Sequence, residues 1–95
     1  MGSLASSAEA FLIRPNLWKP YEDAKPIILD NLPDSSEINI YSVTGQKVKS
    51  ISNNDSSAIE WNGTNDSGER LGSGVYLAVL KAPSGKRMRK FTIVR

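Results

Sequence analysis

The sequence has 95 residues, of which 39% are hydrophobic and 23% charged, a length and composition that suit a single folded domain with one core. It has no cysteine and no histidine, which excludes disulfides, thiolate metal sites and catalytic dyads that pair Cys or Ser with His. The net charge of +2 is too small to predict nucleic-acid binding, so the composition favours a small domain without a catalytic centre.

The first ten residues have neither the basic nor the apolar region of a signal peptide. No apolar run approaches the roughly 20 residues that span a bilayer, so membrane insertion is not expected. The opening Met-Gly-Ser is typical of an expression leader. We therefore expect residues 1–10 to be a leader or a disordered linker and residues 11–95 to be one domain cut from a larger protein.

Short β-rich runs separated by turn residues recur along the chain, and no long segment has clean helical periodicity. They predict about seven strands, near Phe11–Arg14, Pro26–Leu32, Glu37–Val43, Lys47–Ile51, Ser57–Trp61, Val75–Lys81 and Arg87–Val94. The run from Val75 to Leu80 is apolar on both faces, which predicts the central strand of a sheet.

Gly, Asx and Pro residues stand wherever the chain must reverse between these runs, which predicts adjacent antiparallel strands. The glycines assigned to structural turns are Gly45, Gly63, Gly68, Gly74 and Gly85. Short strands around a single core predict an all-β fold, an Ig-like antiparallel β-sandwich.

Large apolar side chains that alternate along the predicted strands are the expected core. The principal core positions are Ile38, Ile40, Trp61, Leu77 and Val79, with Ile28, Val48, Ile59, Phe91 and Ile93 as further candidates. The register of the run from Val48 to Ile51 stays ambiguous by one residue.

One polar loop, Asn62 to Glu69, has oxygen-bearing side chains at alternate positions, as calcium loops do. The twelfth position counted from Asn62 is Ser73, where an EF-hand needs a bidentate carboxylate. A structural turn is therefore the stronger interpretation, with weak calcium binding at residues 62–69 as the minor one. No other cofactor is expected.

Two further surface features have a structural and a functional interpretation. The run Lys86-Arg87-Met88-Arg89-Lys90 holds four cations in five residues, which suits either a charge-protected edge strand or contact with an anionic partner. The aromatic residues Tyr41, Trp18 and Tyr21 could form a carbohydrate-binding face, but they are not spaced along one strand, so packing is favoured.

Four motifs in order resemble one known family. They are Ile38-Asn-Ile-Tyr-Ser-Val-Thr-Gly-Gln-Lys-Val48, Trp61-Asn-Gly-Thr-Asn-Asp-Ser-Gly68, Leu71-Gly-Ser-Gly-Val-Tyr76 and Gly85-Lys-Arg-Met-Arg-Lys-Phe-Thr-Ile-Val94. Together they resemble the Ig-like domain of the flagellar hook-capping protein, which overlaps the C-terminal sorting domains of the type IX secretion system. The resemblance covers about residues 11–95, with Leu17 standing where the family's Pro-Asn-Pro segment has its second proline.

The resemblance implies a non-enzymatic C-terminal module of a larger exported bacterial protein, secreted or at the cell surface by way of the periplasm. Its function would be sorting or anchoring of upstream cargo, with the outer-membrane secretion machinery as partner. The residues implied in recognition are Lys86, Arg87, Arg89, Lys90, Phe91, Ile93, Val94 and Arg95.

Two alternatives stay open at this point. The first is an Ig-like spacer or accessory domain that packs against a neighbouring, catalytic or non-catalytic, domain of the same polypeptide. The second, a minor one, is a carbohydrate-binding module. In each case we expect a monomer as the isolated domain.

Overall fold

A computed structural model describes residues 10–22 and 25–95. Apart from Ala10, the predicted leader or linker lies outside the described residues. No helix in the described part of the chain is long and apolar enough to cross a membrane. The strands are β1 (Leu12–Arg14), β2 (Leu17–Trp18), β3 (Ile27–Asp30), β4 (Ser36–Ser42), β5 (Lys47–Asn53), β6 (Ala58–Trp61), β7 (Gly74–Ala82) and β8 (Gly85–Ile93).

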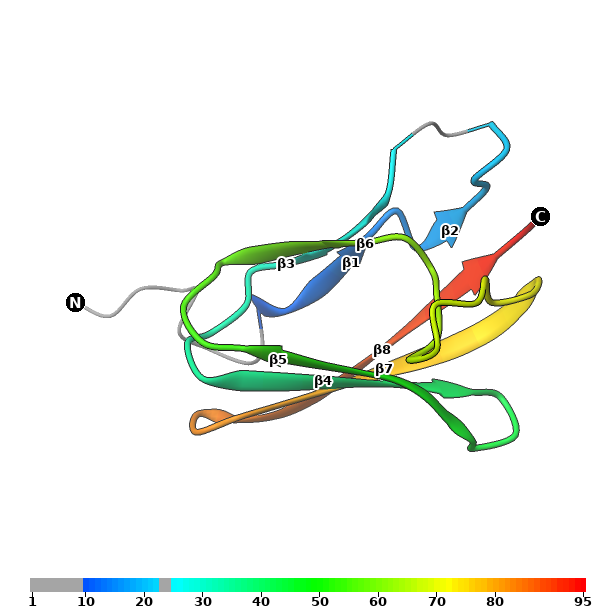
Figure 1. Cartoon of the computed structure of the whole chain (residues 1–95). Helices are drawn as coiled ribbons and strands as arrows, with labels where there is room; N and C mark the ends of the chain where they lie inside the picture. Colours follow the sequence, from blue (N-terminus) through cyan, green and yellow to red (C-terminus); the bar gives the residue numbers. More distant parts are fainter. Residues whose placement is uncertain (1–9, 23–24) are drawn as a thin grey trace.

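The strands form two layers that face each other across one core, as Figure 1 shows. One sheet has the order β1-β3-β6 and the other the order β2-β8-β7-β4-β5. All neighbours are antiparallel except β2 and β8, which run parallel. The predicted all-β, Ig-like sandwich is confirmed, with eight strands instead of seven because β2, only two residues long, was not predicted.

In the three-stranded sheet, alternate residues of β3 and β6 point into the core. Ile27 lies opposite Trp61 and Leu29 lies opposite Ile59, and these pairs cover the inner face. Ile28, a core candidate from the sequence, lies between the two inward positions of β3 and is only half-buried.

The principal core positions on β7 were assigned one residue out of phase. Leu77 and Val79 are half-buried on the outer face of the sheet. The buried residues of this strand are Tyr76, Ala78 and Leu80. The pairing with β4 decides this phase, because the buried Ile38 lies opposite Leu80. The strand is apolar at every position, so its own sequence could not distinguish its two faces.

A β-bulge explains why the register of β5 was ambiguous. The pairing of β4 with β5 shifts between Ile40 and Tyr41, which leaves Val48 as an extra residue on β5. Val48 and Ile51 are three residues apart and would face opposite sides of a regular strand. Both pack against the core because the bulge reverses the alternation between them.

Three aromatic side chains, one from each of β6, β7 and β8, occupy the centre of the core. The ring of Phe91 meets Trp61 edge to face and stacks on Tyr76, with centroids 5.7 Å apart in each pair. The Tyr76 hydroxyl donates a hydrogen bond of 2.8 Å to the carbonyl of Gly72, so its polar group is satisfied at the edge of the core.

Asn53, at the end of β5, is a buried polar residue that holds two turns together. Its amide group donates to Pro33 O, Ser36 Oγ and Ser56 O at 2.9–3.1 Å, and its Oδ1 accepts from the Ser56 amide. We expect Asn53→Ala to lower the free energy of unfolding by about 2–3 kcal/mol, because it leaves buried partners unsatisfied. Denaturant unfolding checks this value, and the exposed neighbour Asn54→Ala should change it by less than about 0.5 kcal/mol. Equal losses would contradict the assigned role.

Candidate recognition surface

The terminal strand β8 is bonded to β7 along its whole length but to β2 only at its end. The Thr92 amide donates to Asn16 O at 2.8 Å and the Val94 amide to Trp18 O at 2.9 Å. Backbone groups of a strand alternate between its two sides, so residues with the parity of Thr92 direct theirs away from β7. Among the described residues, β8 therefore has a strand partner on its outer side only near its C-terminal end.

The rest of that side is an open strand edge. Lys86, Met88 and Lys90 have the same parity as Thr92, so their N–H and C=O groups point away from β7. No strand of the described residues pairs with them there. We call the backbone of these three residues the β8 edge. The Met88 carbonyl accepts a hydrogen bond of 3.4 Å from Arg89 Nη1 of the same strand. An open row of backbone N–H and C=O groups can template an added strand.

Cations border the β8 edge on the outer face of the sheet. Lys86 and Lys90 are exposed, and Lys86 lies directly opposite Lys81 of β7. Like charges at opposing positions destabilise a sheet. The one carboxylate in register with these two lysines is that of Glu37 on β4, which lies opposite Lys81. We call Lys81, Lys86 and Lys90 the basic cluster. Its positive charge exceeds the negative charge next to it.

Of the other residues implied in recognition, Arg95 is exposed, Val94 is half-buried, and those of β8 are buried or half-buried. Phe91 is 1% exposed and Ile93 is fully buried, so both are core residues in the structure. Arg87 and Arg89 are half-buried, and Arg89 Nε donates to Phe11 O at 2.9 Å. A partner docking on the folded domain would therefore meet Lys86 and Lys90 but not the buried side chains of β8.

Arg95, two residues after the end of β8, is held in place by several contacts. The Arg95 amide donates to Ser73 Oγ at 2.8 Å, and Arg95 Nε donates to the carbonyl of Leu71. Its guanidinium lies over the Trp18 ring, 5.7 Å from the ring centroid. Such a position gives a cation–π attraction in addition to the hydrogen bonds.

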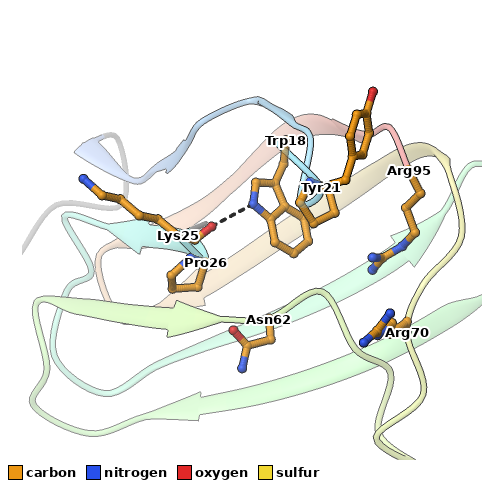
Figure 2. A pocket seen from close by; sticks show the side chains of 8 residues that line it. Trp18, Tyr21, Lys25, Pro26, Asn62, Arg70 and Arg95 are labelled. Carbon is orange, nitrogen blue, oxygen red and sulfur yellow. Dashed lines mark hydrogen bonds between the residues drawn. The ribbon is translucent and has the colours of Figure 1, made fainter. Parts of the chain in front are cut away.

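Arg95 forms one side of a surface cleft of about 510 Å³ (Figure 2). The cleft is lined by Trp18, Pro20, Tyr21, Lys25, Pro26, Asn62, Arg70 and Arg95. Sequence reasoning missed this site because its residues come from separate segments and share no motif. In the sequence, Arg70 and Arg95 are 25 positions apart and nothing indicates that they lie together.

The outer face of the five-stranded sheet has an apolar stripe. Leu17, Val75 and Met88 are exposed on it, and Leu77 and Val79 are half-buried. The stripe crosses three adjacent strands, since Leu17 is in register with Thr92 of β8 and Met88 with Val79 of β7. A continuous apolar stripe on a sheet face is typical of a docking surface.

Side-chain oxygens of the loop considered for calcium have hydrogen-bond or ion-pair partners within the protein. Asn65 Oδ1 accepts from the amides of Ser67 and Glu69 at 2.9 Å, and Asn65 Nδ2 donates to Glu69 Oε1 at 3.1 Å. Asp66 Oδ1 lies 3.9 Å from Lys49 Nζ. Gly68 has φ of +84°, which the turn requires and glycine adopts without strain. These contacts explain the loop as a turn, and calcium binding there stays a minor prediction.

The three aromatic residues considered for carbohydrate binding do not share a face. Trp18 is 4% exposed and its indole N–H donates to Lys25 O at 3.0 Å. Tyr41 is half-buried on the outer face of β4, whereas Tyr21 is 63% exposed in the loop after β2. Stacking on a sugar ring needs coplanar exposed rings, so this arrangement does not favour a carbohydrate platform.

Comparison with known proteins agrees with the fold. The chain aligns with a structure of PorZ, described as an essential bacterial surface component of the type IX secretion system of Porphyromonas gingivalis, at 23% identity and a TM-score of 0.81. It aligns with dimeric latent PorU of the same organism at 24% identity and a TM-score of 0.62. The alignments cover 99% and 88% of this chain but only 13% and 9% of the two longer chains.

Likeness at these identities shows the fold alone, and a search of the curated proteins found no match. Residues 18–86, well over half of the 95 residues, match the family described as the FlgD Ig-like domain. The match includes the strands β3 to β7 and the loops that resembled the family in the sequence. The chain belongs to the FlgD Ig-like domain family.

Proposed function

We propose that this domain is a non-catalytic module of a larger exported bacterial protein and that it sorts or anchors its cargo at the outer membrane. The observation that carries the proposal is the β8 edge, with which no strand of residues 10–22 and 25–95 pairs and which the basic cluster borders. Further support comes from the fold shared with PorZ, described as a surface component of the type IX secretion system. The protein would then lie at the cell surface or in the medium, reached through the periplasm.

Recognition would proceed by addition of a strand to the sheet. An extended segment of the secretion machinery would hydrogen-bond to the backbone groups of Lys86, Met88 and Lys90, which supplies affinity without a pocket. Carboxylates on that segment would lie beside Lys86 and Lys90 and compensate their charge. The free energy of binding would come from the main chain, and the charges would select the partner.

The experiment attaches the full chain to an exported fluorescent reporter in a bacterium with an active type IX system. We expect the reporter at the surface or in the medium with the domain and in the periplasm without it. Lys90→Glu should lower the exported fraction several-fold, because it reverses a charge beside the β8 edge. The matched control is Lys47→Glu, an exposed lysine of β5 on the same sheet. Retention of the reporter with the intact domain, or equal effects of both variants, would contradict the proposal.

The apolar stripe favours a second function, that of an accessory domain packed against a neighbouring domain of the same polypeptide. The stripe offers the exposed side chains of Val75 and Met88 for such packing. In the intact parent protein this function predicts that Val75→Asp makes the junction between the domains more sensitive to protease while export stays normal. Loss of export with an unchanged junction would instead favour sorting.

A further inference from the structure

We propose that the cleft between Trp18 and Arg95 binds a small ligand with an oxyanion, a carboxylate or a phosphate, joined to a ring-shaped apolar body. The cleft lies at the C-terminal end of β8, whereas the β8 edge occupies its other part. The inference therefore does not depend on the proposed function. It concerns a separate site that the sorting mechanism does not use.

The charges around the cleft favour an anion. Arg70 and Arg95 both line it, and Figure 2 shows them on the same side of the cleft. The residues that line the cleft include no Asp or Glu. The two ion pairs found among the described residues, Arg14 with Asp30 and Lys49 with Asp66, involve neither arginine. Two guanidinium forks that face one cleft match the paired oxygens of a carboxylate or a phosphate.

The Arg95 side chain is already held in a fixed position. Its Nε bond to Leu71 O and its place over the Trp18 ring leave the two Nη groups as the donors for a ligand. The amide of the same residue is fixed by Ser73. A side chain that is ordered before binding loses little conformational entropy when the ligand arrives, which favours affinity.

The remaining walls suit an apolar body. Pro20 and Pro26 are half-buried and line the cleft with their rings. Figure 2 shows Trp18 between Pro26 and Arg95. Arg95 covers the face of the indole, so a ligand ring would pack on the prolines. The exposed Asn62 amide offers a further hydrogen bond. A volume of about 510 Å³ is within the usual range for small-molecule sites.

The test is an NMR titration of the full chain with three probes that share one ring: benzoate, phenyl phosphate and benzamide. The indole N–H of Trp18 reports on the cleft, and that of the core residue Trp61 is the internal control. We expect saturable shifts at Trp18 with a Kd of about 1 mM for at least one anion, and binding of benzamide at least about tenfold weaker. The tighter anion identifies whether the natural group is a carboxylate or a phosphate.

Two variants decide whether the arginines are responsible. Arg70→Gln should weaken binding of the anion about tenfold. The Arg70 side chain is exposed, so the variant should keep the fold, which an unchanged Tm verifies. The matched control is Lys47→Gln, an exposed lysine of β5 at the opposite edge of the sheet from β2, which should leave the Kd unchanged. The proposal is overturned by equal affinity for benzamide, by an unchanged Kd in Arg70→Gln, or by no saturable shift up to roughly 50 mM of any probe.

Discussion

Replacing Phe91 with alanine is expected to lower the free energy of unfolding by about 3–5 kcal/mol. Phe91 is 1% exposed and contacts both Trp61 and Tyr76, so its loss removes the central ring of the aromatic cluster and leaves a cavity. A domain of this size has a total stability of only about 5–10 kcal/mol. The variant should therefore lose roughly half of the stability of the domain.

Denaturant unfolding followed by tryptophan fluorescence measures this loss, and the control is on the same strand. Met88→Ala removes an exposed side chain of similar length and should cost less than about 0.5 kcal/mol. The result would also show that a truncation of residues 91–95 cannot test recognition by itself. Such a truncation removes the core side chains of Phe91 and Ile93 at the same time. A loss below about 1 kcal/mol for Phe91→Ala would contradict the assigned core.

Replacing Gly63 with alanine is expected to lower the free energy of unfolding by about 2–4 kcal/mol. Gly63 has φ of +71°, a conformation that strains residues with a Cβ atom. A Cβ at this position would also overlap Cζ3 of Trp18 and lie 3.1 Å from its Cη2. The Trp18 ring is buried, so it cannot move aside without disturbing its contacts with Arg95 and Lys25.

The matched control separates backbone strain from overlap. Gly45 also has a positive φ, +92°, but a Cβ there would meet nothing within 4 Å. Gly45→Ala should therefore cost only the strain, about 1–2 kcal/mol. Thermal unfolding of both variants gives the comparison. Equal losses would mean that the approach of Gly63 to Trp18 contributes nothing to stability.

Much of the fold could be predicted because its turns and strands have local signals. All five glycines assigned to turns have positive φ values, and the strand bounds differ from those predicted by a few residues. Two features depended on tertiary context. The inward face of β7 is set by its pairing with Ile38 on β4, and both Val48 and Ile51 reach the core through the bulge beside Ile40.

The candidate sites were less predictable than the fold. The cations of Lys86 to Lys90 were evident in the sequence, but only the pairing of β8 shows which of them border an open edge. The family resemblance also implied a recognition role for Phe91 and Ile93, which their burial does not favour in the folded domain. Arg70 and Arg95 line one cleft because Arg95 Nε bonds to the carbonyl of Leu71, the residue after Arg70, and this tertiary contact leaves no local pattern in the sequence.

The central claim, that the β8 edge is recognised, is tested most directly by a proline at Met88. The Met88 N–H points away from β7, so Met88→Pro removes one donor from the β8 edge while the bonds between β7 and β8 remain. Met88→Ala, which keeps this N–H, is the matched control, and the Tm of each variant verifies the fold. With each domain attached to the exported reporter, we predict that Met88→Ala is exported normally and Met88→Pro is retained in the periplasm. Equal export of the two variants would contradict recognition through the β8 edge.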